Sequence, residues 1–336
     1  MAFHSILIAA YNRFAYLKAT IESCLASSDP DLEIIVSDDG SEKDSADRFY
    51  SYIEGLDNRI RIIRHKLNRG AGYRFAELHD EANGELLHLI GSDDLFHPLR
   101  LTATKHSMQE IKSYNTIFCS TAKHLSPEHK LMSMRSNYIS PAGHKACLFF
   151  QPLVVHPTVC TWHPALSGLK PYREKLRAAV DYCFYVDNFF QSQFVSFKMP
   201  LTYLVHSSTG ISRDKDTRCN QLAMHDFVMH RQWSYFIKCS LSDISAIRQI
   251  VVSSEGPQVD ITRYNAEKIS RLKHIVESVR EEALASCNSY SVGKDISIFA
   301  YTESQQLEYK NTLEQYFAYA SSRINEFLKT QNQRVI

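Results

Sequence analysis

The sequence predicts an α/β protein built on a Rossmann-like, doubly wound mixed sheet, mostly parallel, followed by a helical C-terminal region. Through the first hundred residues, apolar runs of strand length alternate with segments of helical periodicity. Two of these runs end in adjacent aspartates. With 336 residues, 44% of them hydrophobic, the chain is long enough for one large domain and a smaller appended one.

The first strand is expected at Ser5–Ala10, a short apolar run that Tyr11 and Asn12 interrupt. Residues 13–27 follow with apolar side chains at helical spacing. Because asparagine is a favoured N-cap residue, Asn12 is predicted to cap this helix.

A second apolar run, Leu32–Ser37, stops at the carboxylates of Asp38 and Asp39. The turn that follows contains a glycine, and Ser41 is predicted to cap the next helix. Arg59–Arg64 alternates apolar and basic residues like a third strand.

The fourth strand is expected within Leu86–Leu95, where an apolar run ends in Asp93 and Asp94. Adjacent carboxylates repel each other and are costly to bury, and a divalent cation would relieve both penalties. The alternative is that Ser92 or Asp93 caps the helix that starts near Pro98.

Parallel strands joined by helices bring the polar residues that follow the strands to one edge of the sheet. That edge would hold Asn12 and both aspartate pairs, and the loop 68–72 is expected to line it as well. The loop contains neither a Walker motif nor a dinucleotide fingerprint. Acidic strand ends without a glycine-rich phosphate loop suggest that a metal ion, Mn²⁺ or Mg²⁺, carries the phosphate charge.

Five short segments, in order and spacing, resemble the landmarks of family-two glycosyltransferases with the GT-A fold. The resemblance implies a nucleotide-sugar donor, a divalent metal and inversion at the anomeric carbon, and it points to bacterial surface-glycan assembly. The segments are Ala9–Arg13, Ile34–Ser41, Asn68–Gly70, Ala82–Glu85 and Gly91–Leu101.

The resemblance also assigns roles to residues in these motifs. Asp94, with Asp93, stands where the family binds the metal and the donor diphosphate. Gly91 departs from the pattern, because many members carry a further aspartate there. Arg74 is the nearest match to a diphosphate-binding arginine. The remaining positions expected to bind the nucleotide sugar are Ala10, Tyr11, Asn12, Arg13, Asp38, Asp39 and Asn68.

Further along the chain, Val180-Asp181-Tyr182 resembles the family's Glu-Asp-Tyr helix start, with valine in place of glutamate. Asp181 is therefore expected to be the general base that takes the acceptor proton. The alternative is that it only caps a helix at 182–191. His206 is expected to contact the metal or the diphosphate, or else to be an ordinary loop histidine. His156 is interpreted as structural packing.

The resemblance ends near Asp214, so the predicted domains are a catalytic domain at 1–213 and a mostly helical one at 214–336. Helices are expected at Gln221–Leu241, Thr262–Cys287 and Glu303–Thr330. The last of these carries an apolar stripe at helical spacing. An intramolecular bundle is favoured for that stripe, with a homodimer seam as the alternative.

Composition and charge limit the partners and the cellular location that we expect for the protein. A net charge of +1 provides no field that would recruit nucleic acid. No apolar run reaches the roughly 18 residues of a membrane span, and no signal peptide is apparent. The eight cysteines contain no Cys-x-x-Cys pair, which argues against a structural zinc site. Isolated thiols in a chain with no apparent export signal fit a reducing cytoplasm. The predicted location is the cytoplasm, with peripheral contact at the inner face of the membrane as the alternative.

Together these features predict a metal-dependent inverting glycosyltransferase of the hexosyl or N-acetylhexosaminyl type. It would move a sugar from a nucleotide diphosphate donor, a UDP-sugar most readily, to a hydroxyl of a glycan or lipid-linked glycan. One alternative is a catalytically silent binding or scaffold protein. The other is a sugar nucleotidyltransferase, which would need a glycine-rich basic loop after the first strand.

Overall fold

The computed structural model describes residues 3–111, 113–135, 140–206, 215–252, 264–288 and 303–333. Contacts within the chain define two compact units. The first comprises 1–140, 154–184 and 192–210, and the second comprises 141–153, 185–191 and 211–336. The predicted boundary after residue 213 placed 141–153 and 185–191 with the first domain, whereas they pack with the second unit.

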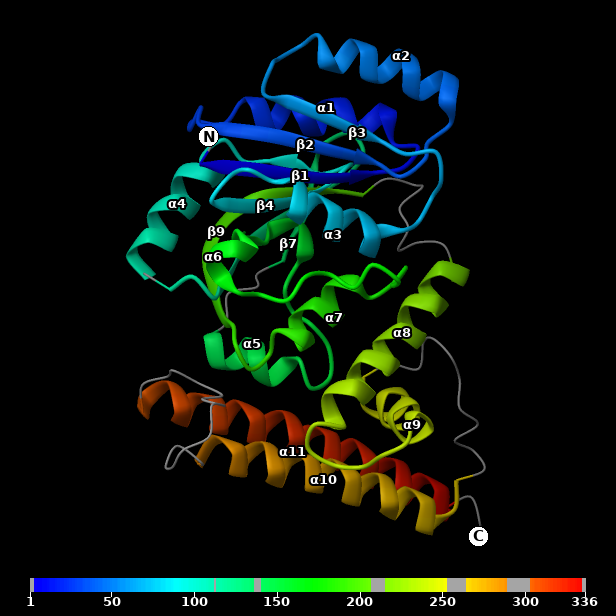
Figure 1. Ribbon diagram of the computed structural model, residues 1–336. Helices are drawn as coiled ribbons and strands as arrows, with labels where there is room; N and C mark the ends of the chain where they lie inside the picture. Colours follow the sequence, from blue (N-terminus) through cyan, green and yellow to red (C-terminus); the bar gives the residue numbers. More distant parts are fainter. Residues whose placement is uncertain are drawn as a thin grey trace. The chain divides into compact units, whose positions relative to one another are not determined.

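A mixed sheet forms the first unit, and its leading half is parallel as predicted. The strands of this half lie in the order β3-β2-β1-β4 and pair in parallel. Their bounds are β1 His4–Ala10, β2 Leu32–Asp38, β3 Ile60–Arg64 and β4 Leu86–Gly91. All four therefore present their carboxyl ends at one edge (Figure 1).

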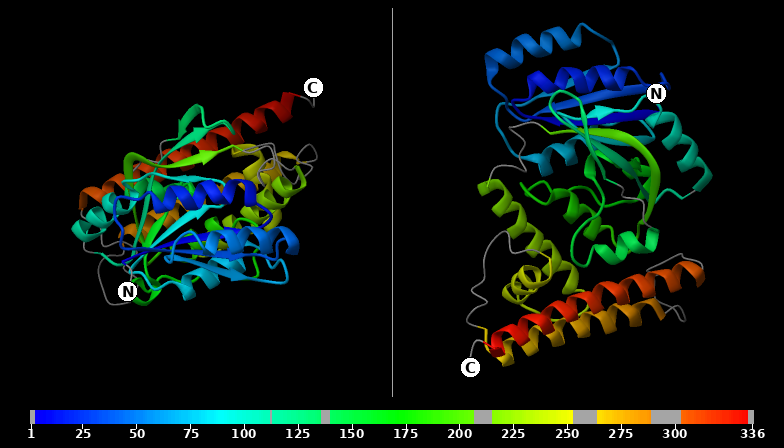
Figure 2. Two further views of the ribbon diagram at one scale, coloured as in Figure 1. Left: turned by 90° about the horizontal axis from the view of Figure 1, so that it is seen from above. Right: turned by 180° about the vertical axis from the view of Figure 1, so that it is seen from behind.

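Beyond β4 the sheet is extended by antiparallel pairings and by one parallel pairing, between β6 and β9. The order continues β8-β6-β9-β5, and β7 pairs with β6. The bounds are β5 Leu95–Phe96, β6 Thr116–Leu125, β7 Leu131–Arg135, β8 Cys160–Trp162 and β9 Gln193–Val205. The long strand β9 curves along this half (Figure 2), and the register with β6 shifts near Ser120 and Thr121. The mixed α/β sheet predicted from sequence is confirmed.

Helices cover both faces of the parallel half, as alternation of side chains along each strand requires. On one face, Ile6 of β1 packs with Leu17 of α1 (Phe14–Leu25) and Tyr50 of α2 (Lys43–Glu54). On the other face, the Ser37 hydroxyl donates to Glu77 of α3 (Ala71–Glu81) at 2.6 Å. The sheet is thus doubly wound.

The two predicted helix caps before α1 and α2 are wrong. Asn12 does not cap α1, because its side-chain oxygen accepts from the Glu42 amide at 2.9 Å instead. Ser41 does not cap α2, because its hydroxyl donates to Asp38. Glu42 caps α2 by accepting from the amides of Asp44 and Ser45. These polar groups tie the β1 and β2 loops to each other.

The remaining helices of the first unit are short or lie at its edge. Helix α4 follows β5, and α6 and the 3₁₀ helix η1 flank β8. Helix α7 begins in this unit with the residue before Asp181. Their bounds are α4 Arg100–Ile111, η1 His156–Thr158, α6 Pro164–Ser167 and α7 Val180–Asp187.

The second unit is helical. Its long helices α10 and α11 lie side by side (Figures 1 and 2). The bounds are α5 Pro141–Cys147, α8 Lys215–Trp233, α9 Leu241–Val251, α10 Ala266–Asn288 and α11 Glu303–Gln333. The helix expected at 221–241 ends earlier, at Trp233 of α8, and a capping box of Ser240 and Asp243 starts the separate helix α9 at Leu241.

The apolar stripe of α11 is buried within the chain. Leu313, Phe317 and Ala320 are fully buried, and the Phe317 ring packs against Phe149 and Trp233. The intramolecular use of this stripe therefore matches the favoured prediction. No described helix is both long enough and apolar enough to cross a membrane.

Gly72 offers a test of how closely α3 approaches the segment that leads to Asp181. A Cβ there would lie 2.4 Å from the Arg173 carbonyl oxygen and 2.5 Å from that of Leu176. We expect Gly72→Ala to destabilise the protein by about 1–3 kcal/mol through this overpacking. Thermal unfolding followed by circular dichroism measures the effect. The matched control is Gly55→Ala, whose Cβ would meet nothing closer than 3.6 Å. Equal melting temperatures for the two variants would contradict the close approach.

Candidate active site

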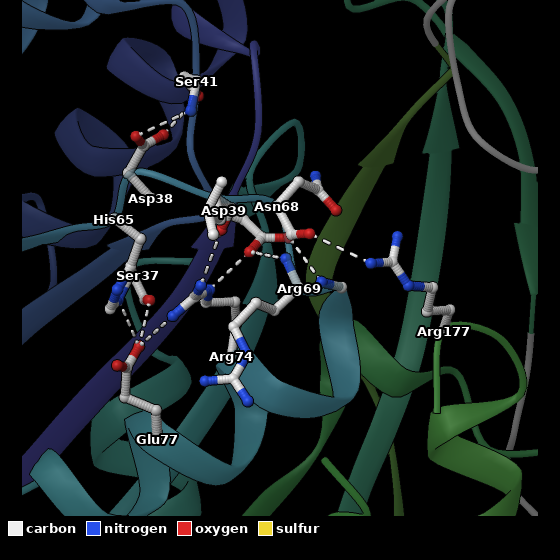
Figure 3. A network of polar contacts seen from close by, with 12 residues as sticks. Ser37, Asp38, Asp39, Ser41, His65, Asn68, Arg69, Arg74, Glu77 and Arg177 are labelled. Carbon is white, nitrogen blue, oxygen red and sulfur yellow. Dashed lines mark hydrogen bonds and ion pairs between the residues drawn. The ribbon is translucent and has the colours of Figure 1, made fainter. Parts of the chain in front are cut away.

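Asp39 lies just beyond β2 and organises the loop after β3. Its carboxylate accepts from the amides of Arg69 and Gly70 at 2.9 and 2.8 Å, and from Nε of Arg74 at 2.7 Å (Figure 3). The Asp39 amide donates to the Ala10 carbonyl at 2.8 Å. Asp39 is 5% exposed, so one buried carboxylate connects the ends of β1 and β2 with the 68–72 loop.

Arg74 is held inside the protein at this position. Besides Asp39, its guanidinium donates to Glu77 at 3.2 Å and to the Leu67 carbonyl at 3.3 Å. Glu77 also pairs with His65 at 2.9 Å (Figure 3). With its side chain 1% exposed, Arg74 acts here as the internal counter-ion of Asp39. Its predicted contact with a donor diphosphate stays a prediction.

Asp38 has protein partners as well. Its carboxylate accepts from the Tyr50 hydroxyl at 2.9 Å, and from both the amide and the hydroxyl of Ser41. The Ser41 hydroxyl oxygen in turn accepts from the Asn12 amide at 2.8 Å. Asn12 adopts a left-handed backbone with φ of 50°, which asparagine tolerates better than most residues. Next to it, the Tyr11 ring is 48% exposed beside the strand ends.

Asp93 and Asp94 follow β4 at the same edge. The Asp94 amide donates to the Gly91 carbonyl at 3.2 Å, which closes a tight turn, and the Asp94 carboxylate accepts from the Val205 amide at 3.1 Å. Burial raises the pKa of Asp94 to about 8, and the charge of Asp93 adds to the rise. Burial also raises the pKa of Asp93, against the opposing field of Arg13. The structure therefore brings the predicted residues Asp93, Asp94 and Arg13 together.

These aspartates fit a divalent cation. Burial and mutual repulsion penalise the ionised pair, and a cation would remove both penalties. Mg²⁺ and similar ions are often held by one or two carboxylates together with substrate phosphates. Among the described residues, no three His, Cys, Asp or Glu side chains form a ready metal cage. A site at Asp94 would thus be completed by the phosphates of a ligand.

His206 follows Val205, whose amide bonds to Asp94, so it lies on the segment beside the acidic turn. Its Nε2 lies 2.6 Å from Nδ1 of His124 on β6, and the two rings stack at 4.8 Å. With Nε2 engaged in this contact, Nδ1 is the His206 nitrogen available to an outside ligand. Its predicted metal or diphosphate contact stays a prediction.

Asp181 sits in the first turn of α7, where the helix dipole favours a negative charge. The charge of Asp181 acts on two neighbours, the half-buried His156 and the buried Tyr172. It opposes the burial that lowers the pKa of His156, and it adds to the burial that raises the pKa of Tyr172. Tyr172 and His156 are themselves 3.4 Å apart, hydroxyl oxygen to Nε2. Asp181 thus belongs to a polar cluster with two residues that packing arguments alone would treat as core.

The segment before Asp181 touches the 68–72 loop. Arg177 donates to the Asn68 carbonyl at 3.1 Å (Figure 3). Gly70, with φ of 93°, brings its backbone close enough that a Cβ there would lie 3.0 Å from Arg177 Cγ. Through this contact the loop that holds Asp39 and the segment that leads to Asp181 lie together in the first unit.

Arg100 is a functional candidate that the sequence did not reveal. It is 1% exposed and donates to four acceptors: the carbonyls of Leu89, Pro157 and Val159 and the hydroxyl of Thr202, at 2.8–3.0 Å. Burial lowers its pKa to about 10, while the charge of Asp94 favours the cation. One guanidinium thereby joins β4, η1, β8 and β9 next to the acidic turn. The only sequence signal was its place at the end of the Gly91–Leu101 segment.

Comparison with known structures first defines the class. The fold resembles S. aureus TarS 1–349 in complex with UDP-GlcNAc, with a TM-score of 0.55 and 15% identity over 95% of this chain and 92% of TarS. It also resembles the Pyrobaculum calidifontis mannosyltransferase PcManGT in complex with GDP-Man and Mn²⁺, with a TM-score of 0.51 and 11% identity over 96% and 86% of the two chains. The fold is thus of the GT-A class.

Sequence comparison then indicates the related family. Residues 5–162 match the model of Glycosyl transferase family 2, so this part of the chain is similar to a family-2 glycosyltransferase domain. An uncharacterised glycosyltransferase of Nostoc sp. is 34% identical over 97 residues, which is 29% of this chain and 30% of the relative. The matched region is therefore less than two thirds of that relative.

The Arg74–Asp39 pair can be tested by removing its cation. Arg74→Met leaves the buried Asp39 carboxylate without its counter-ion, and we expect a loss of about 3–5 kcal/mol of stability. Thermal unfolding of the purified variant measures this. Arg61→Met is the control, because Arg61 pairs with Glu81 on the surface and such pairs contribute at most about 1 kcal/mol. If the two variants melted at the same temperature, Asp39 would not depend on Arg74.

Proposed function

We propose that the protein is a metal-dependent inverting glycosyltransferase that uses a nucleotide-sugar donor. The observation that carries the proposal is the pair formed by the buried Asp94 and the half-buried Asp93 at the carboxyl edge of the sheet. A buried acid with a strongly raised pKa in such a place is a candidate for a functional role. The match of residues 5–162 to the model of Glycosyl transferase family 2 supports the same proposal.

The donor would lie along the carboxyl ends of the parallel strands. Ala10, Tyr11 and Asn12 would enclose the nucleobase, and the exposed Tyr11 ring is suited to stacking on it. Asp39 would meet the base or ribose through a lone pair that its three protein donors leave unused. Arg13, which already acts on Asp93, would face the diphosphate. The two GT-A structures compared were solved with UDP-GlcNAc and GDP-Man, and we favour a UDP-sugar.

Asp94 and Asp93 would hold Mn²⁺ or Mg²⁺, with His206 as a further ligand. A bound cation would supply Lewis-acid stabilisation of the departing nucleoside diphosphate. The role of the protein would be to fix the position of the cation, because the Val205 amide anchors the Asp94 carboxylate. A mannosyltransferase of the same fold was solved with Mn²⁺.

Asp181 would act as general base in a single displacement. The acceptor hydroxyl gives its proton to Asp181 as its oxygen bonds to the anomeric carbon. The bond from that carbon to the diphosphate breaks on the opposite face, so the configuration inverts. We propose a glycan or lipid-linked glycan hydroxyl as acceptor, and a cytoplasmic setting.

Asp94→Asn tests the metal site. The amide keeps the shape and the bond from Val205 but removes the charge. We expect the Mn²⁺-dependent part of UDP affinity to fall by at least tenfold in isothermal titration calorimetry, about 1.4 kcal/mol or more. The metal-free protein should be no less stable than wild type, since the amide removes the cost of burying an ionisable carboxyl beside Asp93. Asp80→Asn, at an exposed position of α3, is the control. Unchanged Mn²⁺-dependent binding in Asp94→Asn would refute the site.

Asp181→Asn tests the base. We expect kcat for transfer to fall by about 10²–10⁴-fold, while UDP-sugar affinity stays at the wild-type value, because only proton removal is impaired. Transfer and donor hydrolysis are followed by UDP release, and affinity by calorimetry. Glu174→Gln is the control, an exposed acid in the same segment. Near-normal turnover in Asp181→Asn would show that another group takes the proton. A wild-type protein that binds donor but neither transfers nor hydrolyses it would be a silent binding protein.

A further inference from the structure

A cavity of about 350 Å³ lies in the first unit, away from the residues discussed so far. Glu85 and Phe3, which line it, immediately precede β4 and β1, and Trp162 ends β8. The end of α4 and the segment before β6 form the rest of its wall, through Met108, Gln109, Ser113 and Tyr114. The volume is at the lower end of the range of about 300–1,000 Å³ usual for small-molecule sites.

This cavity is at the opposite end of the sheet from the candidate active site. Leu86, the first residue of β4, pairs with Trp162, whereas Asp93 and Asp94 come after the last residue of the same strand. The six residues of β4 separate the two ends by about 20 Å at roughly 3.3 Å per residue. A ligand here would not overlap the donor.

Trp162 carries an unpaired hydrogen-bond donor. The residue is 6% exposed, and within the described structure its indole Nε1 has no acceptor. Leaving such a donor buried and unpaired is costly, so buried tryptophans normally find a partner. The other tryptophan follows that rule, because Nε1 of Trp233 donates to the Phe149 carbonyl at 2.7 Å. The orphan donor therefore points to an acceptor that is not part of the described protein.

The lining matches the chemistry of a sugar. Tyr114 packs edge-on against Trp162 at 5.0 Å between ring centroids and is itself 54% exposed, which leaves an aromatic surface open at the cavity. Pyranose rings pair an apolar face of C–H bonds with a rim of hydroxyls. The open aromatic surface can pack against the C–H face of the sugar. The Glu85 carboxylate, the Gln109 amide and the Ser113 hydroxyl can form hydrogen bonds with the sugar hydroxyls. A purely apolar ligand would leave these polar groups unused.

We propose that this cavity is a second saccharide-binding site, which holds part of a glycan chain at a distance from the reaction centre. A pyranose ring would pack on Tyr114 and accept a hydrogen bond from Nε1 of Trp162 through a hydroxyl oxygen, with a small shift of the Tyr114 ring to admit it. The Glu85 carboxylate would accept from another hydroxyl. The choice of a saccharide over other ring-shaped ligands rests on the proposed function.

The chain contains two tryptophans, which makes the test direct. Full-length protein labelled with 5-fluorotryptophan gives two ¹⁹F resonances, assigned with Trp162→Phe and Trp233→Phe. Methyl glycosides of glucose, galactose and N-acetylglucosamine are titrated to about 50 mM, above the millimolar Kd of a weak site. We expect at least one sugar to shift the Trp162 resonance saturably and to leave that of Trp233 unmoved.

Two variants sharpen the result. Tyr114→Ala should weaken the sugar's affinity about fivefold to tenfold by removing the stacking surface. Glu85→Gln should weaken it less and leave the resonance position of the free protein unchanged. Tyr52→Ala, at a comparably exposed tyrosine of α2, is the control and should bind as wild type does.

Failure of this inference is distinct from failure of the proposed function. If no sugar moves the Trp162 resonance, or if both resonances move together, the site is refuted, whatever the transferase assays show. If Trp162 responds in a protein that neither binds nor hydrolyses UDP-sugars, the second site stands and the catalytic proposal falls.

Discussion

The burial of aspartates at the carboxyl edge of the sheet is the constraint on which the rest of the site depends. Asp39 and Asp94 are 5% and 6% exposed, yet the protein treats them differently. Asp39 has a buried guanidinium, Arg74, and two backbone amides. Asp94 accepts from a backbone amide and has a second carboxylate beside it. The charge of Asp39 is neutralised by Arg74 inside the protein, whereas a cation from outside would neutralise the charge of Asp94.

Because of this difference, the residues on the two sides of β1 have different roles. Around Asp39, hydrogen bonds fix the backbone of the loop after β3. The hydrogen bond from Arg177 to the Asn68 carbonyl connects this loop to the segment before Asp181. Around Asp94, the anchoring groups come from β4 and β9, and the buried Arg100 holds those strands to β8 and η1. Internal hydrogen bonds and the Arg74–Asp39 ion pair thus hold in place the strands and loops around Asp93 and Asp94, whose charge is left for a ligand.

Much of this frame is predictable from sequence, because it rests on local pattern. Apolar runs and helical spacing located the four parallel strands and their helices, and the rule for parallel connections brought Asp38–Asp39 and Asp93–Asp94 to one edge. The partners of polar side chains were not predictable. Asn12 and Ser41 are both good cap residues, yet each bonds across the β1 and β2 loops, 29 or more residues away for Asn12. Local propensity yields to such pairings because they form only once the sheet is assembled.

The same limit explains His156 and Arg100. A histidine next to a proline shows no pattern that would place it near Asp181, and a single arginine after a turn reads as a surface residue. Burial of either is visible only in three dimensions. The prediction of the C-terminal helices was wrong for a different reason. The apolar residues of 221–241 continue at helical spacing across the turn that separates α8 from α9, and the capping box at Ser240 was the available signal.

Gly91 connects the departure from the family pattern with the physics of the site. A Cβ at this position would lie 2.5 Å from an Asp94 carboxylate oxygen and 3.2 Å from one of Asp93. A further aspartate there would therefore force the Asp94 carboxylate out of its present position. The chain lacks one carboxylate, but Asp94 is buried and Asp93 is half-buried, and low polarity around them strengthens their attraction for a cation. Fewer acidic groups in a drier setting can provide the same electrostatic pull as more groups in water, so the missing aspartate does not argue against metal binding.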